Sequence, residues 1–287
     1  MGIGLREHIA SLVAVFIALA AGILLGVSLS RQEPLESRMA NLSRQFESLS
    51  RENREVRERA QALERHLRAR GEFDAPLLAG MLTGRLTGVP VGLLWVGDFD
   101  RVRFEADLGG TLSLAGADVV GSVALAPDFI KRVTEAKEAD ILGQAASEPG
   151  AANKIASAIG SLAASGSWEQ LKSPAQMGLL TLSGALLGRP KMVVVVVSLD
   201  VEESVAVALM LPRLLEGLQQ GVGFILVAEP SNAPMSAVGI CRRAGVTTVD
   251  NIETIPGQVA MVWALAGRVE GAFGVKDTAQ GLLPERA

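Results

Sequence analysis

The sequence has very little of the side-chain chemistry that most catalytic sites use. Of its 287 residues, one is cysteine and two are histidine. Both histidines, His8 and His66, lie in the first quarter of the chain. A single cysteine cannot form an intrachain disulfide. The rest of the chain also lacks the histidine that a Ser/His/Asp triad or a histidine base requires, so we do not expect the protein to be an enzyme.

Signatures of nucleotide and nucleic-acid binding are missing as well. The segment Val96-Gly97-Asp98-Phe99 follows the first valine-rich run. It has neither a G-x-G-x-x-G pattern nor a P-loop lysine, so a nucleotide-dependent enzyme loses its main support, and no cofactor is predicted. The net charge of −4 gives no reason to expect a nucleic-acid partner. Cys241 lies in an apolar context that favours a buried thiol over a reactive one, with a bridge between subunits as the alternative.

The N-terminal part of the chain does contain a long apolar run. The run extends from Ile9 to about Leu29. As a helix rising 1.5 Å per residue, it would span about 30 Å, the thickness of the hydrocarbon core of a bilayer. A cleaved signal peptide has a shorter apolar stretch, of roughly 7–15 residues, and a cleavage site that Ser28-Leu29-Ser30 imitates poorly. The sequence therefore predicts a retained transmembrane anchor at residues 9–30, after a short tail at 1–8.

One face of this predicted span consists of small residues. Ala18, Gly22 and Gly26 recur every four residues, the spacing that lets two membrane helices approach closely. The alternative is that glycine is simply common in membrane helices. The three residues are therefore a candidate dimer interface, and other evidence for a dimer is needed to support it.

Positively charged residues bear on the orientation of the span. Arg6 precedes it, whereas Arg31, Arg38 and Arg44 follow it. This count alone would keep the C-terminal side in the cytoplasm. The N-terminal tail is too short to be a domain, however, and we favour a single-pass protein of the cell membrane with its N-terminus inside and its body extracytoplasmic.

A heptad pattern follows the apolar run. From Pro34 onward, apolar residues alternate at spacings of four and three, and no helix breaker occurs before Gly71. The d positions are Leu35, Leu42, Leu49, Val56 and Leu63, and the a positions are Met39, Phe46, Asn53, Ala60 and Leu67. A lone helix packed on its own domain would have a broader apolar face, whereas a buried Asn53 would pair with its twin in a parallel dimer. Residues 34–70 are therefore predicted to form the coiled-coil stalk of a homodimer.

The remaining chain, about 200 residues, is long enough for one sizeable core. Short valine-rich runs typical of buried parallel strands alternate in it with helical patterns. The predicted strands are 91–96, 119–125, 192–198, 224–227 and a candidate fifth at 246–249, and the predicted helices are 128–142, 151–164, 201–220, 235–244 and 258–269. This alternation predicts an α/β domain at 85–275 with a Rossmann-like or flavodoxin-like parallel sheet covered on both faces, followed by a tail at 276–287.

Carboxylates follow the predicted strands at the edge where ligands of such sheets bind. The residues concerned are Asp98, Asp100, Asp200, Glu229 and Asp250. A cluster of carboxylate oxygens could hold Mg²⁺ or Ca²⁺. Helix capping explains them better, since Asp200 and Glu203 have the D-x-x-E form of a capping pair. Asp98 or Asp100 could start a helix in the same way, so the group is kept as a speculative crevice with no predicted metal site.

Several segments of the chain are similar in their order of residues to a known protein family. They are Arg6, His8, 11–16, 18–20, 22–23, 25–26, the stalk, 115–121 and 245–264, the last with Val249-Asp250-Asn251 and Gln258-Val259-Ala260. Together they resemble the actinobacterial copper-transport outer-membrane protein family, the MctB-like proteins, over nearly the whole chain. Membership would imply an envelope protein with a membrane-proximal helix and a role in copper homeostasis or efflux.

Two functional hypotheses follow, because the residues themselves do not form an evident copper site. Copper sites use thiolate, thioether or imidazole ligands. The candidate thioethers Met177, Met192, Met210, Met235 and Met261 are scattered and suit core packing. One hypothesis is therefore copper homeostasis, with copper implied by resemblance alone. The other is a non-enzymatic scaffold that recruits an envelope or cell-division protein through its coiled coil and α/β domains.

Overall fold

The structure, a computed structural model, describes residues 5–285 except 99, 137–139 and 200–203. Some side chains within described helices also fall outside the described part, including those of Leu35, Met39, Leu63 and Leu67. The chain divides into two compact units, Met1–Glu72 and Phe73–Ala287, which are treated separately below.

The N-terminal unit consists of helix α1, which runs from Leu5 to Leu82 and so extends into the second unit. The helix passes through Pro34 and Gly71, so the predicted anchor and stalk lie on one helix. The segment His8–Val27 is long and apolar enough to cross a membrane. Its side chains are exposed, as those of a lipid-facing helix are.

A seven-stranded sheet forms the centre of the second unit. The strands are β1 (Pro90–Gly97), β2 (Asp118–Leu125), β5 (Leu180–Ser183), β6 (Met192–Ser198), β7 (Phe224–Glu229), β8 (Thr247–Asp250) and β9 (Ala272–Phe273). Their order is β5-β2-β1-β6-β7-β8-β9, and all neighbours are parallel except β5, which pairs antiparallel with β2. The five predicted strands and the predicted parallel sheet are therefore confirmed, whereas β5 and β9 were not predicted.

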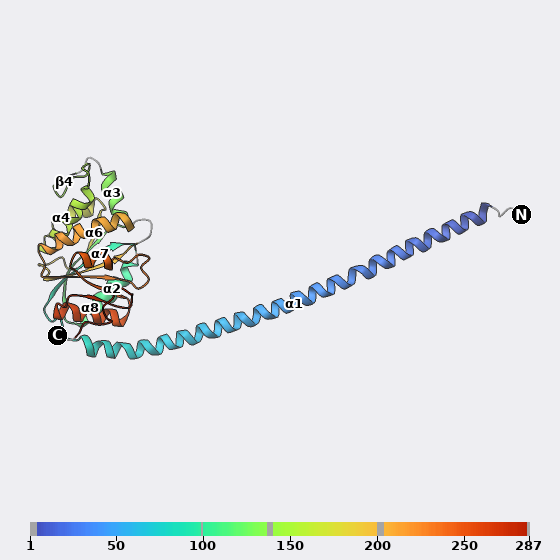
Figure 1. The fold of residues 1–287 in the computed structure, drawn as a ribbon, viewed down its shortest axis with the longest axis horizontal. Coiled ribbons are helices and arrows are strands. Elements are labelled where there is room, and N and C mark those ends of the chain that lie inside the picture. Colours follow the sequence, from blue (N-terminus) through green and yellow to red (C-terminus); the bar gives the residue numbers. More distant parts are fainter. Residues whose placement is uncertain (1–4, 99, 137–139, 200–203, 286–287) are drawn as a thin grey trace. The chain divides into compact units, whose positions relative to one another are not determined.

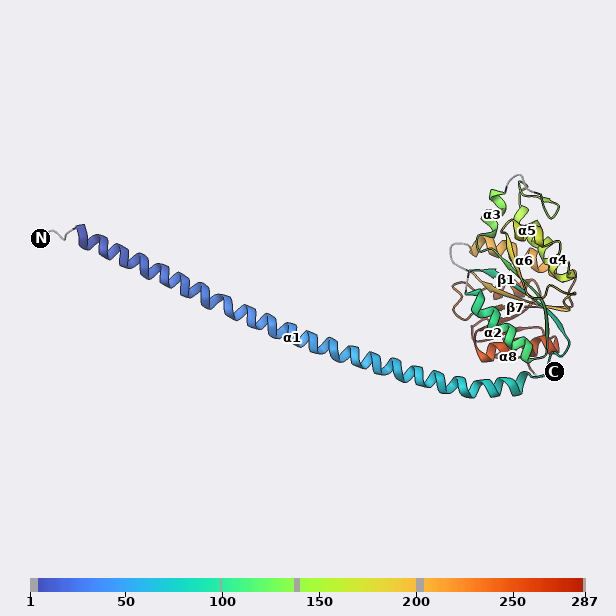
Figure 2. The same cartoon turned by 180° about the vertical axis from the view of Figure 1, so that it is seen from behind.

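Helices cover both faces of this sheet. They are α2 (Arg101–Leu114), α3 (Phe129–Glu135), α4 (Ala151–Ser165), α5 (Lys172–Gln176), α6 (Ser204–Gln219), α7 (Val238–Arg243) and α8 (Ile255–Gly267). Figure 1 and the reverse view in Figure 2 place α4 and α6 on one face and α2 and α8 on the other. Two hydrophobic cores result, one beneath α3–α7 and one beneath α2, α8 and Leu82 at the end of α1.

The predicted helix at 128–142 is wrong beyond Glu135. Helix α3 ends there, and a two-stranded hairpin of β3 (Asp140–Ile141) and β4 (Gln144–Ala145) follows. The turn residues Leu142 and Gly143 have φ values of 55° and 76°. Positive φ at both central residues is the requirement of a tight two-residue hairpin turn, so the Leu-Gly pair reverses the chain where the apolar pattern suggested a continuing helix.

Helices α4 and α6 pack closely because glycines lie at their contact. A Cβ atom at Gly217 of α6 would clash with the backbone carbonyl oxygen of Ser157 of α4, and one at Gly160 would clash with that of Leu214. The two backbones therefore approach nearer than larger residues would permit. This contact fixes α6 above the sheet, with its N-terminal half at the carboxyl ends of the strands.

Candidate functional site

The order of the sheet reverses between β1 and β6. From β1 the chain continues to β2 on one side, and β6 then pairs with β1 on the other. Gly97 ends β1 opposite Ser198, with a φ of 101°, and a Cβ atom there would clash with the Ser198 carbonyl oxygen. Only glycine suits this position. In open α/β sheets, ligands bind beyond the carboxyl ends of the strands at such a reversal.

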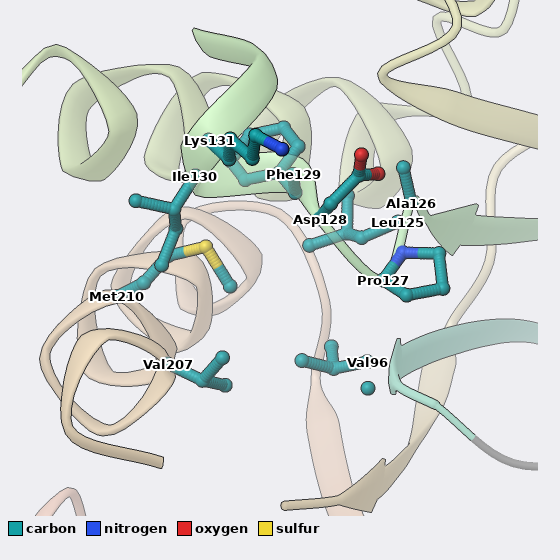
Figure 3. A pocket seen from close by; sticks show the side chains of 11 residues that line it. Val96, Leu125, Ala126, Pro127, Asp128, Phe129, Ile130, Lys131, Val207 and Met210 are labelled. Atoms are coloured by element: carbon teal, nitrogen blue, oxygen red, sulfur yellow. The ribbon is translucent and has the colours of Figure 1, made fainter. Parts of the chain in front are cut away.

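An apolar pocket of about 260 Å³ lies at this edge (Figure 3). It is lined by Val96, Gly97, Leu125, Ala126, Pro127, Asp128, Phe129, Ile130, Lys131, Val207 and Met210. β1 supplies the first two, the β2–α3 segment the next seven, and α6 the last two. Figure 3 shows Val207 and Met210 on the opposite wall from Pro127 and Asp128. The lining is mostly hydrocarbon with one thioether, so the pocket suits an apolar group.

The charges at the pocket lie at the start of helix α3, with Asp128 directly before its first residue. Arg132 Nε donates to the Asp128 carboxylate at 2.5 Å and Arg132 Nη1 donates to the Gly178 carbonyl at 3.2 Å. The hydrogen bond from Arg132 lowers the pKa of Asp128 and raises that of Arg132. Lys131 is 72% exposed, and its Nζ lies 3.9 Å from Glu135. The carboxylate of Asp128 is therefore already bound by Arg132 of α3, whereas Lys131 projects toward solvent.

Two of the predicted crevice carboxylates come together at the ends of β7 and β8. Glu229 and Asp250 are paired across these strands and are almost fully buried. Glu229 accepts hydrogen bonds from Ser236 Oγ and Ala237 N, both at 2.7 Å, and from Lys276 Nζ at 2.5 Å. Asp250 accepts from the backbone N–H groups of Val275 at 2.7 Å and Lys276 at 3.1 Å. Both carboxylates therefore fasten the segment that follows β9.

The other predicted crevice residues lie elsewhere. Asp98 and Asp100 are exposed after β1, and Asp100 caps α2 by accepting from Arg103 N at 3.3 Å. Asp200 lies outside the described residues. Within the described part of the chain, no three His, Cys, Asp or Glu side chains gather so that they could hold a metal ion.

The sulfur-containing side chains of the second unit mostly pack in its cores. Cys241 is buried, and burial together with the nearby Glu229 raises the pKa of its thiol to about 12. It is therefore protonated at neutral pH, whereas a cysteine ligates a soft metal as the thiolate. Met192, Met210 and Met261 are buried, and only Met177 and Met235 among the predicted candidates are exposed.

The predicted dimer positions on α1 are exposed in the single chain. Leu42, Phe46, Leu49 and Val56 have 58–74% of their surface accessible. Asn53 and Ala60 are exposed too, whereas the side chains of Leu35, Met39, Leu63 and Leu67 lie outside the described part. In the apolar span, Ala18, Gly22 and Gly26 are exposed, and a Cβ atom at either glycine would have open space around it.

The sequence patterns missed the pocket and the role of Lys276. The pocket residues Val207 and Met210 belong to a helix whose sequence is apolar on nearly all sides, and this composition was the available signal. Lys276 was assigned to the C-terminal tail, because β9 is only two residues long and gives no strand pattern. Nothing in the local sequence indicates that this lysine reaches Glu229.

One protein family matches almost the entire sequence. The family model described as "Copper transport outer membrane protein, MctB" matches residues 2–284. No curated protein matches the chain significantly.

Proposed function

The chain belongs to the MctB family of copper transport outer membrane proteins, and from this premise we propose that it is a non-enzymatic, homodimeric scaffold of the cell envelope. In this proposal a membrane anchor and a parallel coiled coil hold two α/β units, and the protein contributes to copper homeostasis by recruiting a protein partner. It does not ligate copper itself.

The observation that carries this proposal is the exposed heptad seam of α1. Four large apolar side chains, Leu42, Phe46, Leu49 and Val56, follow the a/d spacing and are mostly exposed in the single chain. Such a narrow stripe is typical of a helix that packs against a second helix of the same kind. Asn53, also on the seam, favours a parallel pair, because its amide can then bond its twin.

The architecture of the second unit supports a binding module. Counted along the chain, the six parallel strands have the order 2-1-3-4-5-6 across the sheet. This extends by one strand the flavodoxin-like order of doubly wound sheets. The apolar pocket lies where the strand order reverses and suits the binding of an apolar group. Catalysis there is not expected, since the lining has no nucleophile next to a general base.

Membrane anchoring rests on the segment His8–Val27. Its 20 residues fit the thickness of a bilayer. We propose that it crosses once, with the N-terminus inside and the α/β unit outside, which is where an envelope partner would be found.

Direct copper binding is the second candidate function, favoured by the description of the family. The chemistry of the side chains favours an indirect role in copper homeostasis. The one thiol is buried and protonated, and the exposed thioethers Met177 and Met235 lie on different segments, one after α5 and the other between β7 and α7. A tight Cu(I) site uses several soft ligands that converge.

Two measurements on the full-length protein in lipid nanodiscs test the proposal. Mass photometry should find a dimer, and the double variant Leu42→Ala/Leu49→Ala should be largely monomeric at the same concentration. Competition with a chromophoric Cu(I) chelator should show no copper retained at one per chain. A monomeric wild type would contradict the scaffold. Stoichiometric retention that Met177→Leu or Met235→Leu abolishes would support direct binding instead.

A further inference from the structure

A second pocket adjoins the first along helix α3. It has a volume of about 460 Å³. It is lined by Ile130, Val133 and Thr134 of α3, by Leu209 of α6, and by residues between 146 and 153, among them Glu148. Ile130 belongs to both pockets, and both have walls from α3 and α6. We call the two pockets and the helix surfaces between them the α3/α6 groove.

Exposed apolar side chains extend this groove along α6. Val205 and Leu209 lie one helical turn apart and are 73% and 65% exposed. Further along the same exposed face, Arg213 and Glu216 form an ion pair at 2.8 Å. The apolar surface is therefore confined to the half of α6 that adjoins the pockets. Apolar surface of this kind, bordered by charges, marks interaction sites.

The arrangement of the pockets favours a polypeptide over a small molecule. The two pockets, of about 260 and 460 Å³, share Ile130 and adjoin the exposed side chains of α6, so a ligand confined to one pocket would leave the rest of this apolar surface in water. Along α3, Phe129–Lys131 line the first pocket and Val133–Thr134 the second. Three or four residues at 1.5 Å each offset these two sets of lining residues by about 5 Å along the axis of α3. Side chains at positions i and i+3 or i+4 of a helix are also about 5–6 Å apart.

We propose that the α3/α6 groove binds an amphipathic helix of a partner protein. The helix inserts one large apolar side chain into each pocket, from positions three or four residues apart, and covers Val205 and Leu209 with the apolar side chains beside them. The proposal rests on the scaffold function above, and it adds where the partner binds and what its recognition segment looks like.

The charges of the groove specify the partner further. Among the described residues that line the pockets, the charged ones are Asp128, Lys131 and Glu148. Arg132 and Lys154 hold the two carboxylates at 2.5 Å. Lys131 forms a long, exposed ion pair with Glu135, at 3.9 Å, so its ammonium is accessible to a partner. An acidic residue on the polar edge of the partner helix would complement the ammonium of Lys131. The recognition segment therefore includes a Glu or Asp beside the apolar residues that enter the pockets.

A phage-displayed library of helical peptides, selected on the full-length protein in nanodiscs, tests the groove in vitro. We expect binders with two large apolar residues three or four positions apart. Their affinity should fall at least tenfold on Leu209→Glu and stay unchanged on Glu216→Gln, a matched change on the charged half of the same helix. The thermal midpoint of both variants should equal that of the wild type, since both side chains are exposed. An empty selection, or binders indifferent to Leu209→Glu, would overturn the proposal.

A photo-crosslinking amino acid at position 209 in cells identifies the natural occupant. The expected product joins position 209 to an amphipathic helical segment of another protein, whereas position 216 gives none. A crosslink to a second copy of this chain, or equal crosslinking at 216, would refute the assigned occupant. Retention of the partner by the Leu209→Glu variant would refute the groove but leave the scaffold intact. Loss of both the dimer and the partner in Leu42→Ala/Leu49→Ala, with peptide binding unchanged, would separate the two proposals.

Discussion

Replacing Lys276 by methionine should destabilise the α/β unit by about 2–3 kcal/mol, because it leaves the carboxylate of Glu229 buried without its cation. Glu229 is only 2% exposed, and Lys276 Nζ lies 2.5 Å from it. Methionine keeps the length of the apolar stem. It also keeps the backbone N–H of residue 276, which bonds Asp250. The change therefore isolates the ammonium group.

The magnitude follows from the surroundings of the pair. Removing one partner of a fully buried ion pair costs roughly 3–5 kcal/mol. Here the lysine side chain is partly exposed, and Ser236 Oγ and Ala237 N continue to donate to Glu229, so the cost should be smaller, about 2–3 kcal/mol. For a unit of this size, the loss corresponds to a fall in Tm of roughly 5–10 °C.

Urea unfolding of the full-length protein, followed by tryptophan fluorescence, measures the loss, since all three tryptophans lie in this unit. Lys172→Met is the matched control: it removes a lysine from an exposed pair with Glu169 and should cost less than about 1 kcal/mol. In a double-mutant cycle, Glu229→Gln and Lys276→Met should couple by at least about 1 kcal/mol. A Lys276→Met variant as stable as Lys172→Met, or strictly additive changes, would refute the reasoning.

Three further predictions concern other contacts. Gly217→Ala should destabilise the unit by about 1–3 kcal/mol, because the new methyl group meets the Ser157 carbonyl oxygen, whereas Gly239→Ala, which has open space, should be neutral or stabilising in the same urea assay. Cysteine replacing Asn53 in differently tagged chains should form a disulfide readily on oxidation, as a non-reducing gel would show; an antiparallel or monomeric stalk would leave it reduced. The pKa of Cys241 is raised from 9.0 to about 12, so its contribution to stability is complete below pH 9 and is lost as the pH rises toward 12. Cys241→Ala should flatten the fall in the free energy of unfolding over this pH range. An unchanged slope would contradict the raised pKa of this thiol.

The sequence predicted the strands of the sheet best where burial is complete. Every residue of β6 is buried between β1 and β7, and an uninterrupted run of valine is what such an environment requires. β5 has only four residues and borders the sheet antiparallel to β2. It lacks the long apolar run of the parallel strands, because it has a neighbour on one side only, and it could not be distinguished from a loop.

Part of the carboxylate crevice could also be predicted from the order of the strands. Residues that follow parallel strands meet at one edge, so the closeness of Glu229 and Asp250 can be expected from the topology alone. Their partners cannot, because Lys276 arrives after a two-residue strand and a return of the chain to Gly281, which bridges to Phe273. Contacts of this kind depend on tertiary packing that no local pattern encodes.

Helix α6 accounts for the part of the site that a sequence pattern could not locate. The first half of α6, up to Pro212, has no charged residue, and a helical segment that is apolar on all sides is normally buried on all sides. α6 does bury Val207, Met210 and Leu214, yet Val205 and Leu209 remain in water. Burying a large aliphatic side chain is worth about 1.5–3 kcal/mol, which these two residues do not contribute to the fold. That free energy is available to a partner, and the two pockets beside Leu209 are where its side chains can reach.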